Sequence, residues 1–318
     1  MPGAVRVACC QIAPDVEHAD HNAELALAAI AAAVDAGAQI VVVPELVNSG
    51  YMFTSLEEAQ AAAIAPDDDL LAGWAREAAR GDAIVVGGFC ERAPDGRLHN
   101  SSALVDGDGV RAVYRKLHLW GEEPRWFAAG DQPAPVIQTP HGRIGLGVCY
   151  DIEFPELTRG LALAGAELMA LPANWPREAP PSGAADHPTK APPSGAPDHP
   201  TKAPPSGAAD HPTNPLPAGE RPILHSLAAT TAYLSKVYVA VCDRCGSERG
   251  LEFEGGSVIA GPDGWLRAGP VADRGVDTLI AECDLAAARQ KRSGEHNDAF
   301  ADRRPEHYAP ALTAPDRG

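Results

Sequence analysis

The sequence predicts an α/β fold with a mixed sheet, because short β-branched runs alternate along the chain with longer Ala- and Leu-rich stretches. Runs such as 39–43 ("QIVVV") are too short for helices and rich in the residues that favour strands. Two further runs flank "DGDG" at 106–109, which is a hairpin signal, so some neighbouring strands must be antiparallel. A purely parallel sheet is therefore not expected.

The elements follow in order from the first apolar run, 5–12 ("VRVACCQI"), which predicts a buried strand. A helix over 21–35 ends before Gly37, a residue suited to the left-handed conformation found beyond a helix. A second helix, 69–80, follows Asp67 and Asp68, whose carboxylates can cap its first turn. The other expected elements are strands at 39–43, 83–88, 100–105, 110–115, 144–149, 167–171, 237–242 and 256–260, and helices at 155–164 and 224–234.

Residues 177–219 interrupt this alternation and are expected to form a low-complexity insertion. Within it, "PPSGAADHPTKA" occurs in three near-identical copies of twelve residues. Proline, glycine and serine dominate, and too few apolar side chains are present to offset the entropy of ordering the segment. We therefore expect a mobile loop. The recurring His187, His199 and His211 leave a weak metal site as the less favoured alternative.

Composition indicates which partners and which cellular compartment to expect. The formal net charge is −17, from 43 acidic and 26 basic residues, so nucleic acid and anionic membrane surfaces are not expected partners. The opening "MPGAVRVACCQIAP" lacks the pattern of a secretory signal, and no apolar run is long enough to span a bilayer. Seven scattered cysteines indicate a reduced, cytoplasmic protein.

Three residues that can carry chemistry stand at the ends of predicted strands. Glu45 follows "VVVP", Lys116 follows "VYR", and Cys149 closes "GVC". Ligands bind beyond the carboxyl ends of parallel strands, so a carboxylate, an ammonium and a thiol meet there if the three strand ends lie side by side. Each residue alone has an ordinary alternative: a packed thiol, a solvated turn carboxylate or a surface lysine.

Together, the three groups suit acyl transfer to water. A thiol is mostly protonated at neutral pH, and a nearby carboxylate such as Glu45 can take its proton. Attack on an amide carbonyl creates an oxyanion, which the Lys116 ammonium and the backbone N–H of Tyr150 can hold. Glu45 can then return the proton to the leaving ammonia.

The segments "PEL", "YRKLHL" and "CYD" come in the order and at the distances typical of the nitrilase, or carbon–nitrogen hydrolase, superfamily, which this chain resembles. The resemblance extends over most of the chain except the repeat. It implies one domain over 1–318, built as an α-β-β-α sandwich, with a C-terminal tail at 285–318. It also implies that no cofactor or metal is needed and that the chain forms a homodimer or larger homo-oligomer.

The same resemblance assigns roles to residues. Glu45 would be the general base, Lys116 the oxyanion holder and Cys149 the nucleophile. The family's second glutamate stands four residues before a Phe-x-x-Gly, and "EPRWFAAG" places Glu123 there, with the adjacent Glu122 as the alternative. This glutamate would orient the substrate amide and Lys116.

Further residues concern the pocket. Tyr51, Asn174 and Trp175 fall where pocket walls lie in such proteins, although ordinary loop packing is an equal alternative. Cys242 and Cys245 have zinc-knuckle spacing, but no second pair exists, so we expect no metal.

The residues after the nucleophile indicate the branch. Cys149-Tyr150-Asp151 resembles the amidase and carbamoylase branches, whereas nitrilases of the family usually carry Cys-Trp-Glu. Asp151 is expected to fix the turn. The expected function is hydrolysis of a small amide to an acid and ammonia, with N-carbamoyl hydrolysis and nitrile hydrolysis as alternatives. A pseudoenzyme is the non-enzymatic alternative, because the repeat begins soon after Trp175.

Overall fold

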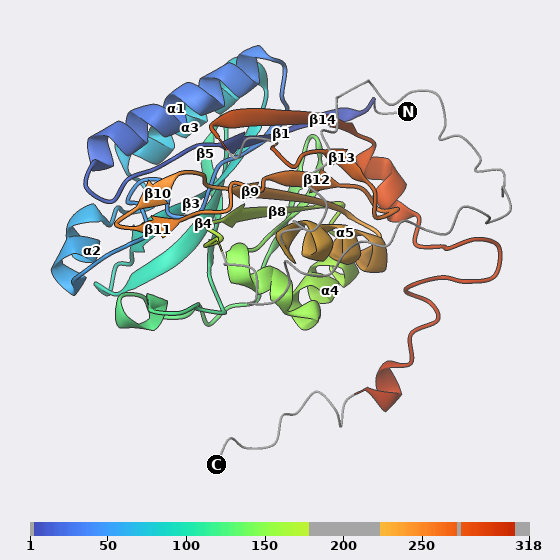
Figure 1. Ribbon diagram of the computed structural model, residues 1–318. Helices are drawn as coiled ribbons and strands as arrows, with labels where there is room; N and C mark the ends of the chain where they lie inside the picture. Colours follow the sequence, from blue (N-terminus) through green and yellow to red (C-terminus); the bar gives the residue numbers. More distant parts are fainter. Residues whose placement is uncertain (1–2, 178–222, 272–274, 309–318) are drawn as a thin grey trace, which may run out of the picture.

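Two six-stranded sheets face each other between two pairs of helices in the computed structural model (Figure 1). The structure describes residues 3–177, 223–271 and 275–308. The predicted insertion at 177–219 therefore lies outside the described residues except for Arg177, and so does the last part of the predicted tail, 309–318.

The first sheet has the strand order β14-β1-β2-β3-β4-β5. Its central strands β1, β2 and β3 run parallel, while β4, β5 and β14 pair antiparallel with their neighbours. The bounds are β1 (Val5–Gln11), β2 (Ile40–Val42), β3 (Ile84–Arg92), β4 (Leu98–Asp106), β5 (Gly109–Arg115) and β14 (Asp277–Cys283). The hairpin predicted at "DGDG" is confirmed, since Asp106 pairs with Gly109.

The second sheet repeats this arrangement in the order β13-β12-β9-β8-β7-β6. Again three central strands, β7, β8 and β9, are parallel and the outer ones are antiparallel. The bounds are β6 (Val136–Thr139), β7 (Gly142–Leu146), β8 (Leu168–Ala173), β9 (Tyr238–Asp243), β12 (Val258–Ala260) and β13 (Leu266–Ala268). A separate small ladder joins β10 (Ser247–Glu248) to β11 (Leu251–Glu252).

Helices cover the outer face of each sheet. In Figure 1, α1 (Ala19–Asp35) and α3 (Asp69–Gly81) lie over the first sheet, and α4 (Pro155–Leu163) and α5 (Ile223–Ser235) lie over the second. The short α2 (Leu56–Ala62) follows the loop beyond β2. The predicted α-β-β-α sandwich with mixed sheets is therefore confirmed.

Alternating side chains explain why five consecutive residues of the first strand, Val7 to Gln11, are buried and all but the last are apolar. Val7 and Cys9 belong to the cluster between the sheets, whereas Ala8 and Cys10 belong to the cluster under the helices. A strand buried on both faces needs apolar residues at every position. The predicted helix signals also hold, since the Asp68 carboxylate accepts a hydrogen bond from Leu70 N at 3.0 Å.

One predicted strand is wrong at its carboxyl end, which carries Cys149. The strand expected over 144–149 ends at Leu146, and Cys149 opens a 3-10 helix (Cys149–Glu153). The reason is local: the N–H of Val148 donates to the Asp151 carboxylate at 2.9 Å instead of to a neighbouring strand. A side chain that captures a backbone N–H in this way ends the ladder.

Beyond β14 the chain forms two short 3-10 helices, Leu285–Arg289 and Pro305–His307. Leu285 and Ala288 of the first helix are buried in the core, whereas Figure 1 shows the second helix lying away from the sandwich. None of the helices in the described parts of the chain combines the length and the apolar character that crossing a membrane requires.

Candidate active site

Glu45 sits in a turn that lies directly against β3. Gly88 holds this turn, because its N–H donates to Pro44 O at 3.0 Å and its carbonyl accepts from Val47 N at 2.9 Å. A Cβ atom at position 88 would lie 2.4 Å from the Glu45 Cα atom, so only glycine permits this approach. The Glu45 side chain is thereby fixed at the carboxyl end of β2, and it is fully buried.

Lys116 follows β5 directly and remains tied to the sheet by its backbone. Its N–H donates to Asn100 O of β4 at 2.9 Å, and its carbonyl accepts from Gly130 N at 2.9 Å. The side chain has no exposed surface. A lysine is almost never fully buried unless its charge is paired, so acidic partners are expected around the Lys116 ammonium.

Cys149 begins the 3-10 helix beyond β7, and its backbone has φ +47°. This left-handed conformation is uncommon for a residue other than glycine, and such strain gathers at functional sites. The residue that follows, Tyr150, lies in the first turn of this 3-10 helix, where backbone N–H groups have no partner within the helix. Its N–H is therefore a candidate donor beside the thiol.

The structure brings the predicted groups together around the lysine. Lys116 Nζ lies 2.8 Å from Glu45 Oε1 and 2.8 Å from Glu123 Oε1. The Cys149 thiol belongs to the same cluster, because the charges of Glu45 and Lys116 both act on its pKa and the thiol in turn acts on the pKa of Lys116. Residues from the ends of β2, β5 and β7 thus meet between the two sheets.

The two oxygens of Glu45 are not equivalent. Oε1 accepts from Lys116 Nζ at 2.8 Å and from Asn100 Nδ2 at 2.7 Å. Oε2 is buried and has no hydrogen-bond partner among the described residues. The carboxylate is therefore held by one oxygen while the other is available to accept a proton.

Glu123 and Glu122 differ sharply in their surroundings. Glu123 is 3% exposed and accepts from Lys116 Nζ and from the Tyr51 hydroxyl at 2.9 Å. Glu122 is exposed and pairs with Arg125 on the surface. Geometry therefore favours Glu123 as the second glutamate of the site.

The electrostatics keep the thiol protonated and the lysine charged. Burial raises the pKa of Cys149 well above its usual range, and the Glu45 carboxylate raises it further, while Lys116 acts in the opposite direction. Burial also disfavours charge on Lys116, yet the carboxylates of Glu45 and Glu123 hold its pKa above the usual range. Burial likewise raises the pKa of Glu123. A protonated thiol in the same buried cluster as a carboxylate with one unpartnered oxygen is suited to attack coupled to proton transfer.

The three predicted pocket residues differ in how they contact the site. Tyr51 contacts the site through its hydrogen bond to Glu123. The backbone N–H of Asn174 donates toward the Cys149 thiol, and the Asn174 side chain is buried with no hydrogen-bond partner among the described residues. Trp175 is partly buried, and its backbone N–H donates to Asp243 Oδ1 at 2.9 Å.

Sequence reasoning missed Asn100 as a member of the site. Its side chain donates to Glu45, and its backbone carbonyl accepts from Lys116. A signal was present in "HNSSALV", where polar residues occupy consecutive positions of a strand that is buried on both faces. A buried amide in a strand needs a partner, and that need could have indicated the site.

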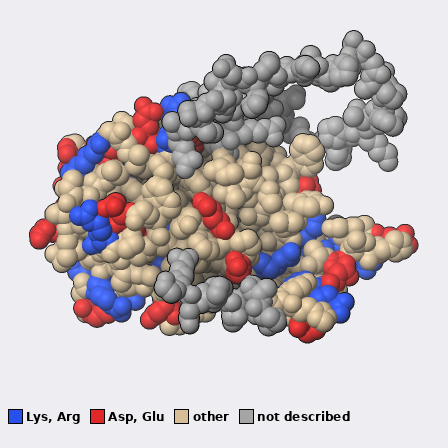
Figure 2. All heavy atoms as spheres, turned by 60° about the horizontal axis from the view of Figure 1, so that its bottom comes forward, with Lys and Arg blue, Asp and Glu red and all other residues tan. Residues whose placement is uncertain are grey.

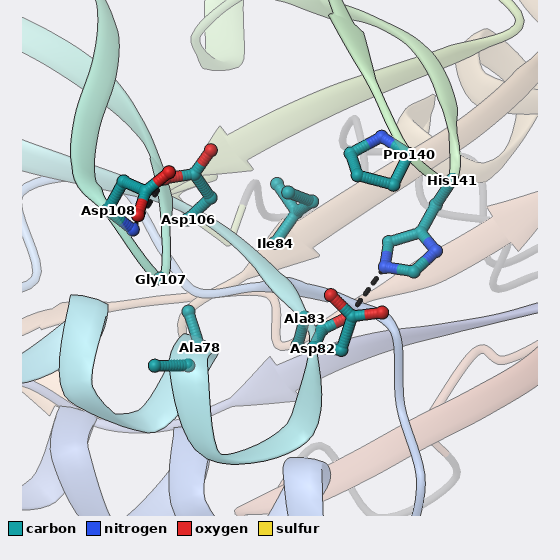
Figure 3. Close-up of a pocket in the computed structure, with 10 residues that line it drawn as sticks. Ala78, Asp82, Ala83, Ile84, Asp106, Gly107, Asp108, Pro140 and His141 are labelled. Atoms are coloured by element: carbon teal, nitrogen blue, oxygen red, sulfur yellow. Dashed lines mark hydrogen bonds between the residues drawn. The ribbon is translucent and has the colours of Figure 1, made fainter.

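A cavity of about 230 Å³ lies at the opposite end of the strands (Figure 3). Its acidic residues, Asp82, Asp106 and Asp108, flank the start of β3 and the turn between β4 and β5. His141 lines it as well and is bound through Nε2 to the carbonyl oxygen of Asp82 at 2.6 Å. It contains neither a thiol nor a lysine, so it offers no nucleophile for acyl transfer. Across the described residues, no set of three or more His, Cys, Asp and Glu side chains is arranged to hold a metal ion.

The chain is similar to known carbon-nitrogen hydrolases over most of its length. Residues 6–192, more than half of the chain, match the family described as carbon-nitrogen hydrolase. A nitrilase from Pyrococcus abyssi is 32% identical over 305 residues, which cover 96% of this chain and 99% of the nitrilase. An N-carbamoylputrescine amidase from Solanum lycopersicum is 29% identical over 302 residues, with 89% and 87% of the two chains covered.

A solved structure shows the same fold. It is a variant of the amidase from Nesterenkonia sp. AN1 with acrylamide added at its active site cysteine, and it superposes with a TM-score of 0.69. The two proteins share 26% identity, and the match covers 97% of this chain and 100% of the amidase chain. A cysteine is therefore the site of covalent chemistry in a protein of this architecture.

Proposed function

Because the chain belongs to the carbon-nitrogen hydrolase family, we propose that it hydrolyses a small linear amide to a carboxylic acid and ammonia, through a thioester at Cys149. It is a hydrolase of the amidase-like branch of the nitrilase superfamily. The observation that carries the proposal is the buried Lys116 ammonium bound by Glu45 and Glu123 in the cluster that contains the Cys149 thiol.

Acylation begins with proton transfer. Glu45 Oε2 takes the thiol proton as the sulfur forms a bond to the carbonyl carbon, because the raised pKa of Cys149 leaves little thiolate beforehand. The oxyanion that results is held by Lys116 Nζ and the N–H of Tyr150. Glu45 then gives its proton to the departing nitrogen, the C–N bond breaks, and ammonia leaves a thioester behind.

Deacylation uses the same groups in reverse order. Glu45 takes a proton from a water molecule as the water oxygen attacks the thioester carbonyl. The second oxyanion collapses, the C–S bond breaks, and Glu45 returns the proton to the sulfur, which restores the thiol. Glu123 holds Lys116 and accepts from the substrate amide, which keeps the scissile carbonyl oriented toward the sulfur.

The test is a substrate panel scored by ammonia release. Short aliphatic amides, N-carbamoyl amino acids and short nitriles are compared by kcat/KM, with the Cys149→Ala variant as the control for contaminating activity. We expect the amides to have the highest kcat/KM. Added hydroxylamine should divert the acyl group to a hydroxamate, because a thioester can be captured by a second nucleophile. Ammonia release without any hydroxamate, or release that persists in the control, would contradict the mechanism.

N-carbamoyl hydrolysis is the second candidate, favoured by the N-carbamoylputrescine amidase among the relatives. The same groups would act, and carbon dioxide would accompany the ammonia. Nitrile hydrolysis is the third, favoured by the relative named a nitrilase. The panel separates the three, since only the carbamoyl substrates release carbon dioxide and only nitriles consume two water molecules.

The proposed setting is the cytoplasm, with a small amide or carbamoyl compound as the substrate and no nucleic acid or membrane partner. All seven cysteines are free, which suits a reducing compartment. On the face shown in Figure 2, basic side chains lie scattered among acidic ones instead of forming an extended basic surface. A homodimer or larger homo-oligomer remains a proposal from the family resemblance, and light scattering after size-exclusion chromatography tests it.

A further inference from the structure

Asp151 is a fully buried carboxylate, two residues after the nucleophile, that accepts four hydrogen bonds. Its Oδ2 accepts from Val148 N at 2.9 Å and from the Tyr114 hydroxyl at 2.9 Å. Its Oδ1 accepts from His118 Nδ1 at 2.7 Å and from His118 N at 3.3 Å. A carboxylate has about four acceptor positions, so these four bonds use its full capacity.

The donors come from two separate segments of the chain. Val148 immediately precedes the nucleophile, whereas Tyr114 and His118 stand two residues before and two residues after Lys116. Asp151 therefore ties both flanks of the lysine to the turn that carries the thiol. The Tyr114 hydroxyl extends the same network, because it donates to Asp151 and accepts from Leu117 N at 3.2 Å.

Aromatic packing reinforces the same connection. The ring of His118 stacks on Phe154 with centroids 3.5 Å apart and planes 6° apart. Phe154 in turn makes an edge-to-face contact with Tyr150, at a centroid separation of 5.0 Å. The His118 ring thus holds the segment after Lys116 against the residues after Cys149, which limits how far either segment can move alone.

We propose that Asp151 is a positioning residue, which fixes the Lys116 ammonium relative to the Cys149 thiol without touching the substrate. This inference rests on the proposed role of Lys116 as the holder of the oxyanion. Its effect on the reaction passes through the lysine, because the Asp151 hydrogen bonds reach the residues on either side of it. A displacement of about 1 Å between such groups typically costs about 100-fold in rate.

The substitution that tests the proposal is Asp151→Asn. It preserves shape, but it replaces one acceptor oxygen with an N–H₂ group that faces donors, so one of the two segments must be released. The matched control is Glu156→Gln, which removes the same charge from an exposed residue in the first turn of α4. The control should change kcat by less than about two-fold, as surface substitutions generally do.

The experiment is a cycle of four proteins: wild type, Asp151→Asn, Lys116→Ala and the double variant. We expect Asp151→Asn to lower kcat about 100-fold with KM changed less than about three-fold. In the Lys116→Ala background the same substitution should lower kcat less than about three-fold, because the group that it positions is gone. An equal loss in both backgrounds, or a higher KM at unchanged kcat, would overturn the positioning role.

A second readout does not depend on amide turnover. The rate of Cys149 alkylation by iodoacetamide, followed by mass spectrometry, should fall about ten-fold in Asp151→Asn and show the same dependence on Lys116. If wild type hydrolyses no amide but the alkylation cycle shows this coupling, the proposed function fails and the positioning role stands. If amides are hydrolysed and neither cycle shows coupling, the positioning role fails alone.

Should Asp151→Asn not fold, Tyr114→Phe replaces it in the same cycle. This variant removes one of the four donors and keeps the buried ring. We expect a loss of about ten-fold in kcat that disappears in the Lys116→Ala background. A loss that persists there overturns the proposal.

Discussion

Acidic side chains gather at both ends of the strands, and their surroundings differ. At the carboxyl ends of β2 and β7, Glu45 and Asp151 have no exposed surface. At the opposite end, Asp108 is 90% exposed in its side chain, and Asp106 pairs with Arg111 at 3.3 Å on the rim of the cavity in Figure 3. Glu45 shares the buried Lys116 ammonium with Glu123, where no solvent screens the charges, whereas solvent screens the acids at the other end.

The largest expected effect comes from the nucleophile. Cys149→Ser should reduce ammonia release to the background of the assay while the melting temperature changes little, because a serine hydroxyl is much harder to ionise beside one carboxylate. The matched control is Cys90→Ser. Burial raises the pKa of Cys90 to about 12, and the charges that act on this thiol are those of Arg92 and Glu91 rather than Lys116 and Glu45. Wild-type turnover by folded Cys149→Ser would contradict the assignment of Cys149 as the nucleophile. A similar loss of turnover in Cys90→Ser would show that the assay reports folding.

Removing the ammonium should impair both rate and stability. Lys116→Ala is expected to lower kcat about 100- to 1000-fold through loss of an oxyanion donor. It should also destabilise the fold by about 3–5 kcal/mol, because two buried carboxylates lose their partner. Arg111→Ala at the other end removes a cation from the partly buried Asp106 and the exposed Asp108 and should cost less than about 1 kcal/mol. Urea unfolding and kcat measurements on both variants test this prediction. A similar loss of unfolding free energy in Lys116→Ala and Arg111→Ala would contradict the contrast between the two ends of the strands.

A smaller effect is expected for Asn100→Ala, which leaves Glu45 Oε1 with a single donor. The carboxylate can then rotate, so kcat should fall about ten-fold while KM stays within about three-fold. Ser102→Ala is the control on the same strand, because the Ser102 hydroxyl is buried with no partner among the described residues. An unchanged kcat for Asn100→Ala would mean that Lys116 alone holds Glu45.

The last prediction concerns Asp243 and the dependence of stability on pH. Burial raises the pKa of Asp243 to about 7, even though the backbone N–H groups of Trp175 and Gly256 donate to it. Between about pH 4 and 7 the folded state therefore holds a proton that the unfolded state has lost. The free energy of unfolding should fall as pH rises, by at most about 1.4 kcal/mol per unit, and level off above pH 7.

Asp243→Asn does not titrate, so the difference between wild type and variant isolates this effect. Urea midpoints at pH 5, 6, 7 and 8 should show the wild type losing stability relative to the variant up to about pH 7. A relative stability that rises with pH would mean that the hydrogen bonds and Arg244 outweigh burial.

Much of the site could be predicted because its groups occur in short local motifs. Glu45, Lys116 and Cys149 each stand near the end of an apolar run, and the carboxyl ends of parallel strands meet at one edge. The partners Asn100 and Asp151 depend on which strands and turns become neighbours. Such contacts join residues 33 to 55 positions apart, so a buried amide in "HNSSALV" indicates that a partner exists but not which residue it is.

The fold was predictable to a similar degree. Strands buried on both faces, such as β1 and β3, are mostly apolar and were found, although β3 extends beyond the predicted 83–88 to Arg92. The strands β6, β13 and β14 were missed, because they are only partly buried and lack a sustained apolar run. The end of β7 was misplaced, because the Asp151 side chain competes there with the strand ladder.

The pairing of β1 with β14 matters for how the protein is made. The register joins Val5 to Cys283 and Gln11 to Asp277, so the first strand completes its outer ladder only with almost the last one. During synthesis, "VRVACCQ" leaves the ribosome long before its partner and exposes an apolar edge that can pair with another chain. At about 5–20 residues per second, this interval lasts on the order of tens of seconds. The yield of folded protein should therefore depend on chaperones that cover strand edges during translation.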